Sequence, residues 1–231
     1  MHVANPPTMT TDPQRTRILL QCGVAIAPLF LAVAAVQMIA RPGFDITQHA
    51  VSSLQNGDFG WVQSANFILC GLLAVLCALG LRRRLAGSRG GTWGPSLVGV
   101  FGIGMIIAGL FPPDPAFGFP EGAPEGAPDA MSTTGGLHSL GFFAAFLTLI
   151  AACFVLARHF DKTLHTWRNI CLIAGVVTPL LIILGTVAST DTPGVFYLAA
   201  GTVSFTWLSA VASAVRSGRP SAPDPAAATT E

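Results

Sequence analysis

Three side chains with acid–base or metal-binding chemistry lie close together in residues 44–53. This segment contains Asp45, His49 and Ser52, flanked on both sides by long apolar stretches. Asp45 and His49 are four residues apart and Ser52 follows three later, so a helix would place all three on one face. A carboxylate beside an imidazole suits either a metal pair or an imidazole oriented for acid–base catalysis.

The same segment also has a structural interpretation. Asp45 as the N-cap of a short interfacial helix, with Gln48 three residues later, would make a capping-box-like start. His49 would then face the lipid headgroups. For this segment taken alone, we favour the structural interpretation.

Three more residues of similar chemistry lie beside other apolar stretches: Asp114, His138 and Asp191. An aspartate between prolines, as Asp114 is, usually belongs to a turn. His138 opens an apolar block, and a helix amino end disfavours imidazolium, so we expect a largely neutral ring available as a base or ligand. Taken singly, Asp114 and His138 are more often structural residues.

The composition is that of a membrane protein. The 231 residues are 52% hydrophobic and only 10% charged, and the mean hydropathy is +0.62. A soluble fold of this size could not bury so much apolar surface. The cysteines read as small core residues and not as a disulfide or metal framework, because all fall inside apolar blocks: Cys22, Cys70, Cys77, Cys153 and Cys171.

Six apolar blocks are each long enough to cross a bilayer and lack Lys, Arg, Asp and Glu: residues 18–40, 61–81, 94–111, 137–157, 169–188 and 194–215. A charge at a helix centre costs about 2.5–3.5 kcal/mol on insertion scales. We therefore predict an all-α membrane protein with six transmembrane helices in a single bundle. Residues 1–17 and 216–231 are predicted to be disordered tails.

Basic residues fall almost entirely on one side of this topology. Only Arg41 lies in a loop of the opposite side, and the other eleven are Arg15, Arg17, Arg82, Arg83, Arg84, Arg89, Arg158, Lys162, Arg168, Arg216 and Arg219. The positive-inside rule then predicts that both termini are cytoplasmic. The same parity of spans places Asp45, His49, Asp114, His138 and Asp191 together at the outer face.

Small residues and prolines give further expectations. The third block contains Gly99, Gly102, Gly104 and Gly109, which allow close helix approach in lipid, so we expect it to be central in the bundle. Pro28 and Pro179 predict kinks. Two copies of Glu-Gly-Ala-Pro, at residues 121–124 and 125–128, are interpreted as a low-complexity spacer.

Several short motifs resemble the domain of unknown function 998 family of small six-span prokaryotic membrane proteins. They are His49 to Leu54 followed by Gly60-Trp61, Phe111 to Asp114 after a glycine-rich span, and Leu137-His138 opening the next span. The resemblance covers residues 18–215. It implies the six-helix fold in a prokaryotic plasma membrane and stresses His49, Ser52, Asp114 and His138, but it implies no established activity.

Two classes of function remain open. The first is a protein that binds a membrane lipid or small amphiphile, or serves a structural role, with Asp45, Ser52 and Asp191 as binding candidates. The second is a membrane-embedded enzyme in which His49, Asp114 and His138 perform acid–base or metal-assisted chemistry on a lipid-like substrate. A divalent metal is the only cofactor considered, and nucleic acid is not expected as a partner. A shared site requires His49, Asp114 and His138 to converge.

Overall fold

The computed structural model describes residues 12–160, 165–188 and 192–218. Within these ranges lie six helices long and apolar enough to cross a membrane. They are α1 (Pro13–Ala40), α2 (Gly60–Arg84), α3 (Trp93–Leu110), α4 (Thr133–Phe160), α5 (His165–Ile183) and α6 (Pro193–Arg216). A short 3-10 helix, η1 (Val51–Gln55), precedes α2, and a π-helical segment, η2 (Leu184–Ala188), extends α5. The predicted all-helical, six-span fold is confirmed.

The helix at the amino end starts earlier than predicted. The Asp12 carboxylate accepts hydrogen bonds from the backbone N–H groups of Gln14 (2.9 Å) and Arg15 (3.4 Å), and Pro13 occupies the first helical position. This N-cap and proline are a standard helix start. Residues 13–17, predicted as part of a disordered tail, are therefore helical. Arg216, predicted in the other tail, is the last residue of α6, and residues 1–11 and 219–231 lie outside the described part of the chain.

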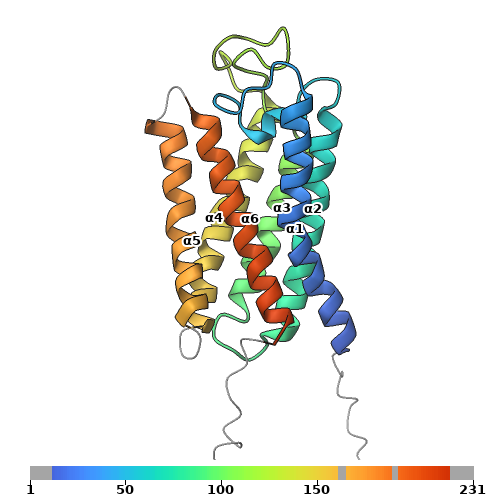
Figure 1. Cartoon of the computed structure of the whole chain (residues 1–231), viewed down its shortest axis with the longest axis vertical. Coiled ribbons are helices and arrows are strands. Elements are labelled where there is room, and N and C mark those ends of the chain that lie inside the picture. The colour runs from blue at the N-terminus through green and yellow to red at the C-terminus, as the bar shows by residue number, and fades with distance from the viewer. Residues whose placement is uncertain (1–11, 161–164, 189–191, 219–231) are drawn as a thin grey trace, which may run out of the picture.

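The six helices form a closed ring in chain order. Each packs against its neighbours in sequence, and α6 closes the ring by packing on α1 (Figure 1). The expectation that the third span is central is therefore wrong, because α3 packs extensively only against α2 and α4. Its glycines serve these two contacts. A Cβ on Gly102 would lie 2.6 Å from the Gly71 carbonyl oxygen of α2, and one on Gly104 would lie 2.7 Å from the Gly141 carbonyl oxygen of α4.

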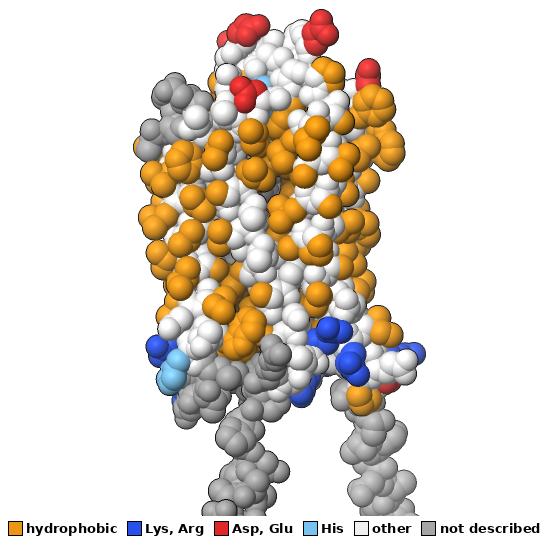
Figure 2. All heavy atoms as spheres, viewed as in Figure 1, with side chains coloured by type: hydrophobic (Ala, Val, Ile, Leu, Met, Phe, Trp, Pro, Cys, Tyr) orange, Lys and Arg blue, Asp and Glu red, His pale blue; other side chains and the backbone are white. Residues whose placement is uncertain are grey.

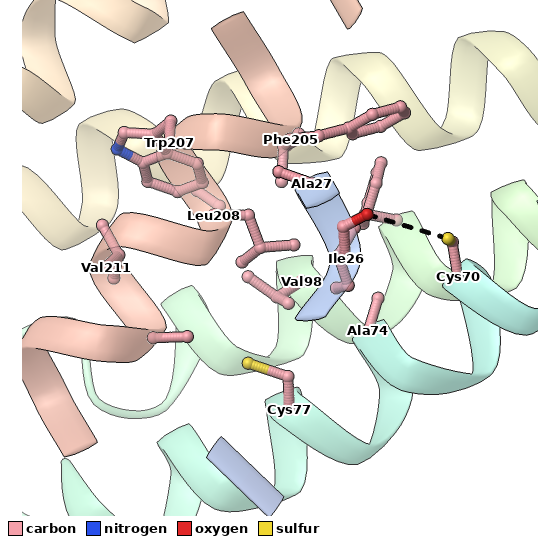
Figure 3. Close-up of a cluster of buried hydrophobic side chains, with 14 of the residues drawn as sticks. Ile26, Ala27, Cys70, Ala74, Cys77, Val98, Phe205, Trp207, Leu208 and Val211 are labelled. Atoms are coloured by element: carbon pink, nitrogen blue, oxygen red, sulfur yellow. Dashed lines mark hydrogen bonds between the residues drawn. The ribbon is translucent and has the colours of Figure 1, made fainter. Parts of the chain in front are cut away.

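Aromatic rings fill the middle of the ring of helices. Phe205 of α6 contacts Phe30 of α1, Phe101 of α3 and Phe146 of α4, with centroid distances of 4.5, 6.0 and 6.5 Å. Toward the end where α1 begins and α6 ends, the interior continues with aliphatic side chains such as Val98 and Leu208 (Figure 3). Helices from different sides of the ring thus contribute side chains to one hydrophobic core.

A serine of α6 makes two hydrogen bonds to the backbone of α1. The Ala27 N–H donates to Ser209 Oγ (3.0 Å), and the Ser209 hydroxyl donates to the Gly23 carbonyl (2.9 Å). This amide and this carbonyl are four residues apart, the spacing of partners within one turn of an α-helix. Pro28, the next residue, has no N–H, so the backbone hydrogen bond that this position would donate within α1 is missing.

The two ends of the bundle carry opposite charge. Described acidic residues other than Asp12 lie in residues 41–59 and 111–132, and Figure 2 shows them at one end of an apolar belt. Described basic residues other than Arg41 lie at the opposite end, where α1 begins and α6 ends. We call these the acidic end and the basic end, and we call residues 41–59 with 111–132 the acidic-end cap.

Candidate functional site

Asp45 starts a single turn, not a helix that continues to Ser52. Its carbonyl accepts from the N–H groups of Gln48 (3.1 Å) and His49 (2.8 Å). Its carboxylate accepts from the backbone N–H (2.8 Å) and the hydroxyl (2.7 Å) of Thr47, not from Gln48. The chain is extended at Ala50 before η1 begins. The predicted short helix carrying Asp45, His49 and Ser52 on one face is therefore wrong, although Asp45 does act as a cap.

His49 uses both ring nitrogens in bonds to the backbone. Nδ1 lies 2.9 Å from the Asp45 N–H, which can only donate, so Nδ1 accepts. The proton is then on Nε2, which donates to the Phe117 carbonyl at 2.8 Å. The side chain is only 4% exposed. Neither nitrogen is left for a metal or a substrate, and His49 joins the two loops of the acidic-end cap.

Phe119 is the centre of this cap. It is fully buried, and its ring packs against Phe44 and His49 with centroid distances of 5.4 and 5.3 Å. The Arg41 guanidinium lies 5.3 Å from its centroid, a cation–π distance. Arg41 also donates to the carbonyls of Leu54 (3.2 Å) and Asn56 (2.6 Å). The lone arginine of the acidic end therefore has a structural role.

The tandem Glu-Gly-Ala-Pro segment, which is part of this cap, is held by backbone hydrogen bonds. The Gly118 N–H donates to the Pro124 carbonyl (2.8 Å), and the Phe117 N–H donates to the Gly126 carbonyl (3.1 Å). These bonds return the chain over Phe119. The interpretation of residues 121–128 as a low-complexity spacer is therefore incomplete, because Pro124 of the first copy and Gly126 of the second both accept bonds that close a defined loop.

The start of α6 also rests on the turn at Asp45. The Gly194 N–H donates to the Thr47 carbonyl (3.0 Å), and a Cβ on Gly194 would collide with the carbonyl oxygens of Ile46 and His49. Only glycine permits this close approach. Residues 44–53 thus contact the 3–4 loop and α6, which makes them the main junction of the acidic end.

Asp114 links the end of α3 to the start of α4. Its carboxylate accepts from the Ser132 N–H (3.0 Å), while the Ser132 hydroxyl oxygen accepts from the Gly135 N–H (3.0 Å). The carboxylate lies directly against Gly135, where a side chain would collide with it. A carboxylate beside free N–H groups at a helix start is stabilised by them and by the helix dipole. Asp114 therefore belongs to the cap of α4.

His138 is anchored at one nitrogen only. Its Nδ1 lies 2.8 Å from the Phe111 carbonyl and 3.0 Å from the Ala108 carbonyl, at the end of α3. Two acceptors require a proton on Nδ1, so the Gln55 amide nitrogen, 3.5 Å away, makes no hydrogen bond to it. In the neutral ring, Nε2 is then an acceptor. None of the described residues bonds to Nε2, although His138 is only 6% exposed.

His138 lines a cavity of about 300 Å³ whose wall is formed by side chains of α1, α2, α4, α5, η2 and α6 together with residues 50–52. The cavity walls are mostly aromatic and aliphatic: the rings are those of Phe30, Phe67, Phe142, Phe143, Phe146 and Phe205. The polar side chains are Ser52, His138, Ser139, Thr186, Tyr197 and Thr202, and none of the lining residues is charged. An apolar pocket with a few convergent polar groups is the usual form of a small-ligand site.

The polar groups of the cavity differ in what they can offer. The hydroxyls of Ser139, Thr186 and Thr202 donate to carbonyls of their own helices. The hydroxyls of Ser52 and Tyr197 have no partner among the described residues. The cavity therefore presents one free acceptor, His138 Nε2, and two free hydroxyls.

The predicted residues do not form one cluster. His49 and Asp114 bond to backbone groups of the acidic-end cap, and only Ser52 and His138 line the cavity. Within the described ranges, no group of three or more His, Cys, Asp or Glu side chains could hold a metal ion. The metal hypothesis therefore has no donor set there, and Asp191 lies outside the described residues.

Residues 24–214 match a protein family that is described as protein of unknown function (DUF998). The chain belongs to the DUF998 family. The match begins at Val24, within α1, and ends at Ala214, near the end of α6, so in this DUF998 protein it includes α2 to α5, most of α1 and α6, the acidic-end cap and the residues that line the cavity. Comparison with curated proteins and with solved structures found no match.

Sequence reasoning missed Arg41, Phe119 and Tyr197 in this DUF998 protein. Phe142 and Phe146 are four residues apart, a spacing that places them on one helix face and could have indicated an aromatic wall. No local signal marks Tyr197, because its importance comes from the approach of α6 to α4.

Proposed function

We propose that this multi-pass membrane protein binds one amphiphilic molecule in the cavity beside His138. We further propose that it lies in a prokaryotic plasma membrane with both termini cytoplasmic and the acidic end outside. The one-sided distribution of arginine supports this orientation. The cavity would then lie in the outer half of the bundle.

The observation that carries the binding proposal is the unpaired nitrogen of His138. The residue is only 6% exposed and stands among aromatic side chains, and no described residue bonds to this nitrogen. A ligand polar group at this position would give it a hydrogen-bond partner. The Phe-rich walls would hold an apolar chain, as in pockets of about 300–1,000 Å³ that bind small ligands.

The geometry favours binding over catalysis. An enzyme using His49, Asp114 and His138 together would need these groups within hydrogen-bond reach of one substrate. His49 has no free nitrogen, and the Asp114 carboxylate is held against Gly135 and the Ser132 N–H. His138 is the only one of the three that lines the cavity.

A cavity-filling variant tests this function. A Cβ on Gly201, which lines the cavity, would meet only Phe205 Cε2 at 3.9 Å, so a side chain can begin there without a clash and Gly201→Leu is chosen to fill the cavity. The matched control is Gly99→Leu on α3, whose Cβ would meet only Ala78 Cβ at 3.7 Å, away from the cavity.

Lipids retained by the purified proteins are measured by mass spectrometry after identical detergent washes. We expect one amphiphile to be enriched in the wild type and in Gly99→Leu but lost from Gly201→Leu. Equal retention by all three proteins, each eluting as a folded species in size-exclusion chromatography, would contradict binding in this cavity.

A further inference from the structure

We propose that the cavity selects an amphiphile with an uncharged hydroxyl head, such as a long-chain alcohol, over one with a charged head. This inference rests on the proposed binding function and specifies the ligand class. It follows from the charges, hydrogen-bond donors and hydrogen-bond acceptors of the cavity wall.

The cavity contains nothing that would neutralise a charged head. Lys, Arg, Asp and Glu are all absent from the residues that line it. An ion moved out of water without a partner pays a large desolvation penalty. Phosphate, carboxylate and ammonium heads are therefore disfavoured inside the cavity, whereas an uncharged head meets no such penalty.

His138 requires a ligand that can donate a hydrogen bond. Its Nδ1–H is fixed by the carbonyls of Ala108 and Phe111, so the neutral ring offers only the Nε2 lone pair. An ether, ester or ketone oxygen cannot donate to this lone pair. A carboxylate would place its own lone pairs against it.

The free hydroxyls of Ser52 and Tyr197 complete the recognition. Each can donate to a ligand oxygen, and both belong to the cavity wall that includes His138. A ligand hydroxyl can donate to Nε2 and accept from one of these groups at the same time. An alcohol is the simplest uncharged head that satisfies both demands.

The test compares three ligands with the same twelve-carbon chain: 1-dodecanol, dodecyl methyl ether and dodecanoate. The protein is held in detergent micelles at neutral pH. The unfolding midpoint is recorded against ligand mole fraction in the micelle. We expect dodecanol to half-saturate the wild type at a mole fraction about tenfold below those of the ether and the acid. Gly201→Leu should respond to none of the three.

His138→Asn removes the acceptor that faces the ligand while its amide can still donate to the carbonyls of α3. We expect dodecanol and the ether to bind this variant within about twofold of each other. Tyr197→Phe keeps the ring and removes only the hydroxyl, so it should weaken the binding of dodecanol and of the ether to a similar extent. It remains informative if His138→Asn fails to fold.

The failures of the two proposals are distinguishable. The wild type could bind all three ligands equally or bind dodecanoate more tightly, while Gly201→Leu loses this binding. That result overturns selection for a hydroxyl head but not binding in the cavity. The same responses in Gly201→Leu and the wild type would overturn binding in the cavity itself.

Discussion

His49 and His138 show how one residue type serves two purposes at similar burial. They are 4% and 6% exposed, and both donate to backbone carbonyls of another segment. The difference lies in the second nitrogen. That of His49 accepts from the Asp45 N–H, whereas that of His138 has no partner among the described residues. The hydrogen bonds that each ring makes, and not its burial, therefore distinguish the structural histidine from the candidate ligand-binding histidine.

His49→Phe should destabilise the protein without affecting ligand retention. The ring would still pack between Phe44 and Phe119, but the Asp45 N–H and the Phe117 carbonyl would lose their partner. We expect a loss of about 1–3 kcal/mol in unfolding free energy, measured by denaturant titration in micelles. Unchanged stability together with lost lipid retention would assign His49 to the binding site instead.

The turn at Asp45 should make the stability of the protein depend on pH. The hydroxyl and then the N–H of Thr47 lower the pKa of the Asp45 carboxyl below its usual value. A lowered folded-state pKa gives stability that is present above the unfolded pKa of about 3.9 and lost as pH falls through the folded pKa. Thr47→Val should therefore lower the unfolding midpoint at pH 7, with the difference from wild type shrinking below about pH 4. A difference that is constant from pH 7 to pH 3 would contradict this account.

Part of the site could be predicted at this scale and part could not. The capping tendency of Asp45 and the turn tendency of Asp114 follow from residue type and immediate neighbours. The hydrogen bond from His49 Nε2 joins residues that are 68 positions apart. A sequence pattern shows only local spacing, so it does not reveal such a bond. Residue chemistry alone could therefore not decide which histidine keeps a free nitrogen.

At the scale of the helices, the α1–α6 contact includes a bridge through the α1 backbone. Ser209 connects the Ala27 amide to the Gly23 carbonyl, and Gly23 itself lies where a side chain would collide with Cys77 of α2. Three helices thus meet at one turn of α1. The length of the six blocks without charged residues predicted these helices. It did not predict that they form a ring, because the arrangement of helices in space depends on contacts between distant segments.

Ser209→Ala should weaken this junction. In the variant, the Ala27 amide can pair with the Gly23 carbonyl, so the loss is limited to the interhelical part of the bridge. We expect about 0.6–2 kcal/mol, the range found for polar contacts between membrane helices. Ser213→Ala, on the same helix and without a hydroxyl bond in the described structure, is the control and should change stability little. Equal effects of the two variants in SDS titration would contradict a specific role of Ser209.

At the scale of the whole molecule, charge separates the two ends of an apolar belt (Figure 2). Ala127→Cys at the acidic end and Ala86→Cys at the basic end are both exposed sites for labelling. With a membrane-impermeant maleimide on intact cells, we expect Ala127→Cys to react and Ala86→Cys to react only after permeabilisation. The wild type, whose cysteines lie in the spans, is the background control. The reverse labelling pattern would invert the proposed topology.

Closure of the ring by α6 has a consequence for biosynthesis. Of the six described helices, α1 is synthesised first and α6 last; they are the pair that completes the bundle, and both contribute walls to the cavity. A nascent chain that lacks α6 has no cavity, and its α1 has no Ser209 to bridge the Gly23–Ala27 turn. The proposed ligand could therefore bind only after α6 has joined α1, so it would stabilise the assembled bundle but would not guide the insertion of the earlier helices.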